Sequence, residues 1–168
     1  MNKPTNFEAH GTTQPIMELG KPTQIGILVN DARRTAGLIS MLTGIGPWRF
    51  EDWPPPDRPE WVSYVDGQST QWRALLAFAT CGSLEIELIE TYEGECGYTD
   101  FVRRRGQGLH HVQFQVGDVE QAARNFEDNG IGVKMSATGR RPGTKWILLD
   151  TEGLIGFGIE ISTKQSPA

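Results

Sequence analysis

The chain has 168 residues, of which 38% are hydrophobic and 22% are charged, and its formal net charge is −5. These values are ordinary for a globular domain or two small fused halves, and the acidic balance gives no basic surface that would indicate nucleic-acid binding. No apolar run approaches the roughly 18 residues that a membrane helix needs, and two cysteines make no disulfide framework, so we expect a protein of the reducing cytoplasm.

The first part of the chain begins with a polar, aperiodic stretch over residues 1–22, which predicts an N-terminal arm. Asn30 or Asp31 can cap the helix that follows the first strand, and Gly44 can end it. The elements expected here are a strand over 23–29, a helix over 32–42 and a short strand over 48–53.

A long polar connection follows the proline run at residues 54–56 and continues to about residue 69. A loop of this length in a small domain is more often functional than idle. Strands are expected next over 71–80 and 83–89, and the connection over 91–105 contains some helix.

The second half repeats this order. We expect a strand over 109–116, a helix over 119–129, further strands over 132–135, 145–150 and 155–162, and a tail over 163–168. The two halves align with His111 at the place of Gln24, and each helix is followed by Gly-Ile-Gly, with a slip of one residue. Two copies of one unit are therefore predicted.

The predicted fold is α+β, with two βαβββ modules that span residues 23–92 and 108–162 and together form one domain over 23–162. Each module would curl its strands into half of a barrel. The pair would then form a cup-shaped sheet around one shared cavity.

Four polar residues occupy symmetric places in this repeat. Gln24 and His111 lie in the first strand of each half, whereas Glu87 and Glu160 interrupt apolar neighbours in the last strand. If the strands curl, all four can point into one cavity. His110 competes with His111 for this role, but the repeat alignment favours His111.

One imidazole nitrogen and two or three oxygens suit one divalent ion, such as Zn²⁺, Ni²⁺, Co²⁺, Mn²⁺ or Fe²⁺. Such an ion polarises a carbonyl, and a neighbouring carboxylate, Glu160 or Glu87, can then remove a proton from the adjacent carbon. Taken one by one, the same residues are more often ordinary core or solvent-facing residues of a strand. The symmetry of the repeat is what groups them into a site.

Tryptophans are concentrated in this chain, with five in all. Trp48, Trp72 and Trp146 are candidates for the walls of a cavity that binds a large or partly apolar substrate, aromatic or acyl. A place in the hydrophobic core is the alternative for each of them.

The segment Gly106-Gln-Gly-Leu-His-His-Val-Gln-Phe-Gln-Val-Gly-Asp-Val resembles the Gly-Glu-Gly-Leu-His-His-Ile-Ala-Phe-Glu-Val-Asp-Asp-Ile pattern of methylmalonyl-CoA epimerases. Residues 84–90 resemble the Leu-Glu-Leu-Leu-Glu strand of those proteins, and residues 150–161 resemble their closing strand. The chain is thus similar to the vicinal oxygen chelate superfamily over residues 23–162.

This resemblance implies paired βαβββ modules around one metal ion, with ligands at Gln24, Glu87, His111 and Glu160. Epimerases usually have His at the position of Gln24, and the set found here is instead similar to that of glyoxalase I of the eukaryotic type. In glyoxalase I the last glutamate is also the base, which implies Glu160. We find no match for the additional glutamate base of epimerases.

The resemblance implies a metal-dependent isomerase, epimerase or lyase that acts through an enediolate-like intermediate, in the manner of methylmalonyl-CoA epimerase, and a homodimer. A glyoxalase I-type lyase is one alternative, and a non-catalytic resistance-type binding protein is another. An extradiol-type dioxygenase is a further alternative, but it would need two histidines and one carboxylate around iron, and Gln24 in place of a histidine argues against it.

Overall fold

The computed structural model describes residues 14–57 and 61–164. Within them lie ten strands and four helices: β1 (Pro22–Leu28), α1 (Ala32–Thr43), β2 (Arg49–Trp53), β3 (Ser63–Val65), β4 (Gln68–Ser69), β5 (Arg73–Cys81), β6 (Leu84–Glu93), α2 (Gly97–Arg105), β7 (Gly108–Val116), α3 (Val119–Glu127), β8 (Val133–Thr138), β9 (Lys145–Leu149), α4 (Glu152–Ile155) and β10 (Gly158–Thr163). None of these helices is long and apolar enough to cross a membrane.

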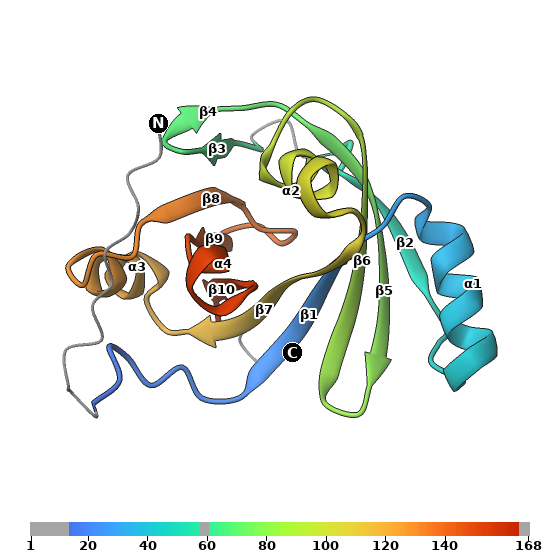
Figure 1. Cartoon of the computed structure of the whole chain (residues 1–168), viewed down its shortest axis with the longest axis horizontal. Coiled ribbons are helices and arrows are strands. Elements are labelled where there is room, and N and C mark those ends of the chain that lie inside the picture. Colours follow the sequence, from blue (N-terminus) through green and yellow to red (C-terminus); the bar gives the residue numbers. More distant parts are fainter. Residues whose placement is uncertain (1–13, 58–60, 165–168) are drawn as a thin grey trace.

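All ten strands belong to one curled sheet, in the order β2-β5-β6-β1-β7-β10-β9-β8-β3-β4 (Figure 1). In each module the first strand pairs in parallel with the last, as β1 with β6 and β7 with β10. The modules meet where β1 pairs antiparallel with β7. The predicted α+β cup is confirmed, and its seam is the pair of strands that the repeat alignment had matched.

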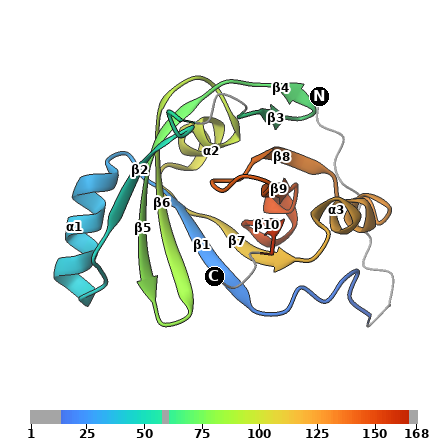
Figure 2. The same cartoon turned by 180° about the vertical axis from the view of Figure 1, so that it is seen from behind.

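Helices α1 and α3 lie on the outer side of the cup, one at each end (Figures 1 and 2). The Asp31 side chain caps α1 by accepting a hydrogen bond from the backbone N–H of Arg34. Buried Ala32 and Ala36 then pack with residues of β5 and β6, while α3 buries Phe126 against β9 and β10. Helices α1 and α3 therefore cover apolar residues of the outer face, whereas α2 belongs to another apolar cluster, together with residues of β1, β5 and β6.

The connection over residues 54–69 differs from the expectation of an unstructured loop. Its end forms the hairpin of β3 and β4, and β3 pairs antiparallel with β8 of the second module. Asp66, in the turn of the hairpin, also forms an ion pair with Lys134 of β8. Strands of three and two residues are too short for an alternating pattern, and their partner lies far along the chain, so no local pattern predicts this hairpin.

The ends of the chain also differ in part from expectation. Ile16, Met17 and Leu19, within the predicted arm, pack against the core cluster under α3. Thr163, placed in the tail, is the last residue of β10. The last strand begins at Gly158 rather than at residue 155, because α4 precedes it and ends at Gly156 in the left-handed conformation. Residues 1–13 of the arm and 165–168 of the tail lie outside the described residues.

Candidate functional site

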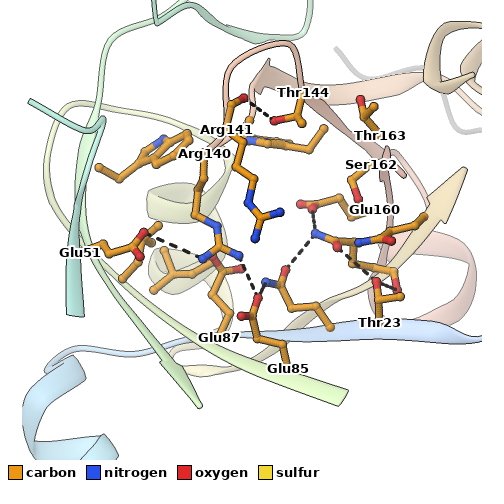
Figure 3. Close-up of a pocket in the computed structure, with 18 of the residues that line it drawn as sticks. Thr23, Glu51, Glu85, Glu87, Arg140, Arg141, Thr144, Glu160, Ser162 and Thr163 are labelled. Carbon is orange, nitrogen blue, oxygen red and sulfur yellow. Dashed lines mark hydrogen bonds and ion pairs between the residues drawn. The ribbon is translucent and has the colours of Figure 1, made fainter. Parts of the chain in front are cut away.

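The concave face of the cup encloses a cavity of about 590 Å³. Side chains from both modules reach into it, and Figure 3 shows that it is crowded with polar and charged groups. Glu87 and Glu160 project from the two opposite sides of the seam, and the turn between β8 and β9 hangs over them. The cavity is thus a shared property of the two halves.

Alternation along the strands turns the predicted residues inward. In the register of the sheet, Gly26 of β1 lies opposite Glu87 on one side and His111 on the other. Gln113 of β7 lies opposite Gln24 on one side and Glu160 on the other. The four predicted residues therefore come from adjacent strands of one concave face, and Gln113 holds in module two the place that Gly26 holds in module one.

The His111 imidazole lies directly over Gly26. A Cβ atom at position 26 would be 2.1 Å from Cε1 and 2.3 Å from Nε2 of His111. Real Cβ atoms do not approach heavy atoms this closely, so only glycine leaves the room that the ring occupies. The glycine on β1 is therefore part of the construction of the site.

His111 is completely buried, and its Nε2 faces both carboxylates. This nitrogen lies 3.5 Å from Oε2 of Glu87 and 3.7 Å from Oε2 of Glu160, and among residues 14–57 and 61–164 it has no hydrogen-bond partner. The other ring nitrogen, Nδ1, is 3.2 Å from Nδ1 of His110. The ring of His110 instead packs edge-on against Tyr98, so His111 is the histidine that meets the carboxylates.

An amide network joins the remaining polar groups. Gln24 donates from Nε2 to Oε1 of Glu85 over 2.7 Å. The Gln113 amide donates to Oε1 of Gln24 over 3.0 Å and to Oε1 of Glu160 over 2.7 Å. The side-chain oxygen of Gln24 is thereby satisfied by Gln113.

Burial sets the acidity of the site. It raises the pKa of Glu160; the neighbouring His111 opposes this effect and the charge of Glu87 adds to it. Burial by itself lowers the pKa of His111, but the charges of Glu160 and Glu87 outweigh it, so the pKa is raised. Burial also lowers the pKa of His110, which keeps that ring neutral. His111 and Glu160 therefore both hold a proton more readily than an ordinary histidine or glutamate does.

The donor set fits a divalent ion. An unpaired, buried imidazole nitrogen is costly unless something accepts its lone pair. Two ligand atoms ~2.1 Å from one tetrahedral ion lie about 3.4 Å apart, close to the separations of His111 Nε2 from Glu87 and Glu160. Within the described residues, however, no three His, Cys, Asp or Glu side chains are already arranged to hold an ion, and Gln24 would have to turn its oxygen away from Gln113.

The three predicted tryptophans have different places. Trp72 and Trp146 line the cavity, together with Trp53 and Tyr98. Trp48 does not line it, because its indole packs near α1 and donates to Oγ of Ser40 over 2.9 Å. The cavity therefore has an aromatic wall, formed by Trp53, Trp72, Tyr98 and Trp146, and Trp48 is not part of it.

Several polar and charged residues of the cavity were not among the predicted site residues. Glu85 shares the inward face of β6 with Glu87, and Gln113 shares that of β7 with His111, so strand alternation could have indicated both. Arg140 and Arg141 come from the turn between β8 and β9, where no local pattern shows that the side chains reach the cavity.

Known proteins place the chain in a family. The family model described as the Glyoxalase/Bleomycin resistance protein/Dioxygenase superfamily matches residues 23–147. No curated protein matches the chain.

Solved structures share the fold. A hypothetical protein from Bacillus halodurans C-125 is 20% identical, with a TM-score of 0.63, over 88% of this chain and 96% of that one. A variant of Streptomyces coelicolor methylmalonyl-CoA epimerase in complex with 2-nitronate-propionyl-CoA is 20% identical, with a TM-score of 0.60. The match covers 89% of this chain and 100% of that one. The methylmalonyl-CoA epimerase from Mycobacterium tuberculosis is 16% identical, with a TM-score of 0.61. The match covers 86% of this chain and 88% of that one.

The family match covers most of the chain, and the fold is that of these structures, which confirms the resemblance drawn from the Gly-Leu-His-His strand. The chain belongs to the Glyoxalase/Bleomycin resistance protein/Dioxygenase superfamily, the vicinal oxygen chelate proteins.

Proposed function

We propose that the protein is an enzyme that removes the proton on the carbon next to a carbonyl of a small-molecule substrate, as an isomerase or epimerase similar to methylmalonyl-CoA epimerase. A divalent ion would be held by Gln24, Glu87, His111 and Glu160. The single observation that carries this proposal is the buried Nε2 of His111, which faces two carboxylates and has no hydrogen-bond partner in the part of the chain that the structure describes.

When bound, the ion supplies positive charge that polarises the substrate carbonyl and makes the adjacent C–H more acidic. Glu160 is the base in this proposal, because it holds the place of the last glutamate of the glyoxalase I set, and its Oε2 lies 3.7 Å from Nε2 of His111. Glu87 approaches His111 from the other module and would carry the proton on the second face of the substrate carbon. The aromatic wall, with Trp72 and Trp146, would hold the apolar part of the substrate.

The pair of histidines supports the same assignment. If Nε2 of His111 is a ligand, the proton of that ring must sit on Nδ1, which then donates to Nδ1 of His110 over 3.2 Å. Burial lowers the pKa of His110, so its Nδ1 keeps the lone pair that this hydrogen bond needs. His110 would thus orient His111 without touching the ion.

Metal affinity and proton exchange test the proposal. We expect near one divalent ion per chain in wild type, measured with Zn²⁺, Ni²⁺, Co²⁺, Mn²⁺ and Fe²⁺, and a loss of binding in His111→Ala. The control is Glu127→Gln, an exposed carboxylate on α3. Glu160→Gln should lose solvent deuterium exchange into methylmalonyl-CoA or a related thioester. Full exchange in Glu160→Gln, or a chain that binds none of these ions, contradicts the proposal.

A lyase of the glyoxalase I type is a second candidate, because Gln24 completes a ligand set similar to that of glyoxalase I. Formation of a thioester from the hemithioacetal of methylglyoxal and glutathione, without exchange into acyl-CoA substrates, would select it. A non-catalytic binding protein is a third, favoured by the Gln113 amide, which already satisfies Gln24 and Glu160. Ligand binding without metal affinity would select that function.

A homodimer in the cytoplasm remains a prediction from the resemblance and from the composition. Size-exclusion chromatography with light scattering would test the dimer directly.

A further inference from the structure

Four cationic side chains line the cavity, but they differ in their partners. Within the described part of the chain, three of them have a carboxylate close by: Arg49 with Glu51 at 2.5 Å, Arg140 with Glu85 at 2.9 Å, and Lys145 with Glu120 at 2.6 Å. Arg141 is the fourth, and its guanidinium makes no hydrogen bond or ion pair with any residue of 14–57 or 61–164.

The backbone of Arg141 is held while its side chain points inward. The Thr144 hydroxyl donates to the carbonyl of Arg141 over 2.6 Å, and the amide of Gly139 donates to the carbonyl of Thr144 over 2.7 Å. Figure 3 shows the Arg141 side chain descending from this turn into the cavity, between Arg140 and Glu160, with its guanidinium clear of the drawn contacts. The turn therefore presents a cation to whatever enters the cup.

The net charge of the cavity with a divalent ion bound also supports a binding site for an anion. The paired cations cancel their carboxylates, and a divalent ion, which rests on the proposed function, would cancel Glu87 and Glu160 if both are ionised. One positive charge, on Arg141, is then left in the cavity. A guanidinium binds a planar carboxylate through two parallel hydrogen bonds, which gives direction as well as attraction.

We propose that Arg141 is the anion-binding residue of the cavity and that the substrate carries a negatively charged group, a carboxylate, which this guanidinium holds while the aromatic wall receives its apolar part. The residue is then a determinant of substrate class: acids are accepted, and neutral esters or amides of the same shape are bound more weakly. A phosphate ester presents the same kind of oxygen, so both sources need to be tested.

The experiment measures binding of phenylacetate, phenyl phosphate and neutral phenylacetamide to full-length protein by calorimetry, first without metal and then with Zn²⁺. Variants are Arg141→Gln, Arg141→Lys and, as control, Arg34→Gln, an exposed arginine on α1 outside the cavity. We expect wild type to bind phenylacetate about tenfold more tightly than the amide, the equivalent of about 1.4 kcal/mol. Arg141→Gln should remove this preference, Arg141→Lys should retain part of it, and Arg34→Gln should leave it unchanged.

The outcomes separate the two proposals. An unchanged preference in Arg141→Gln, or no preference for acid over amide in wild type, overturns the anion site. A preference for phenyl phosphate over phenylacetate that still depends on Arg141 keeps the anion site and overturns the carboxylate assignment. Loss of the preference in metal-free Arg141→Gln supports the anion site even if the protein binds no divalent metal ion. A protein that binds no divalent metal ion contradicts the proposed function but not the anion site.

Discussion

The close approach of His111 to Gly26 makes the substitution Gly26→Ala a sharp test of how the site is built. The added methyl group would lie 2.1, 2.3 and 2.5 Å from Cε1, Nε2 and Nδ1 of the ring. An ordinary contact between carbon atoms is about 3.5 Å or more, so the ring must retreat by about 1.4 Å. His111 is completely buried, which leaves it no open space to enter.

Overpacking of this kind costs about 1–3 kcal/mol. For a chain of this size, a loss of about 2 kcal/mol lowers the melting temperature by roughly 4–8 °C. A displacement of ~1 Å at a functional group can cost about a hundredfold, so we expect the affinity of Gly26→Ala for a divalent ion to fall by at least ~10-fold.

Thermal unfolding followed by circular dichroism and metal titration by calorimetry measure the two effects. The matched control is Gly37→Ala in α1, because a Cβ there meets nothing within 4 Å. In a helix this change should stabilise the protein by about 0.5–1 kcal/mol. A Gly26→Ala protein that melts like wild type would refute the packing argument, and one that is destabilised but binds metal normally would refute the role of Gly26 in placing His111.

Three further predictions concern stability and reactivity. Asp31→Ala removes the cap of α1 and should cost about 1 kcal/mol, measured by urea unfolding, and an unchanged midpoint would contradict it. Phe126→Ala leaves a cavity in the core under α3, where Phe126 is 5% exposed, and should lower the free energy of unfolding by about 3–5 kcal/mol in the same assay. A decrease below ~1 kcal/mol would show that neighbouring side chains fill the space. Burial raises the pKa of the Cys96 thiol, whereas Cys81 is exposed, so iodoacetamide at mildly alkaline pH should label Cys81 first and Cys96 only on unfolding; equal rates would refute this.

The sequence predicted the parts of the fold that depend on local pattern. Alternation and capping located most strands and helices α1 and α3, and the internal repeat matched β1 with β7, the two strands that pair at the seam. The same alternation placed His111 on the polar face of its strand, where the structure shows it next to Glu87 and Glu160.

What the sequence missed depends on contacts between distant segments. The hairpin of β3 and β4 exists because β8 offers it an edge, and nothing in residues 63–69 shows this. Arg141 reaches the cavity because the sheet curls beneath its turn, and Trp48 fails to reach it because α1 offers Ser40 as a nearer partner. The network at Gln113 was likewise invisible, since both of its acceptors lie on other strands.

The pairing of β3 with β8 has a consequence for how the chain acquires its structure. During synthesis, at roughly 5–20 residues per second, residues 63–65 emerge well before their partners in β8, and until then β4 is the only strand available to pair with them. Closing so long a loop costs chain entropy before the contacts between β3 and β8 can offset that cost. The first half therefore cannot complete its own sheet, and the hairpin docks only after the second half has been made.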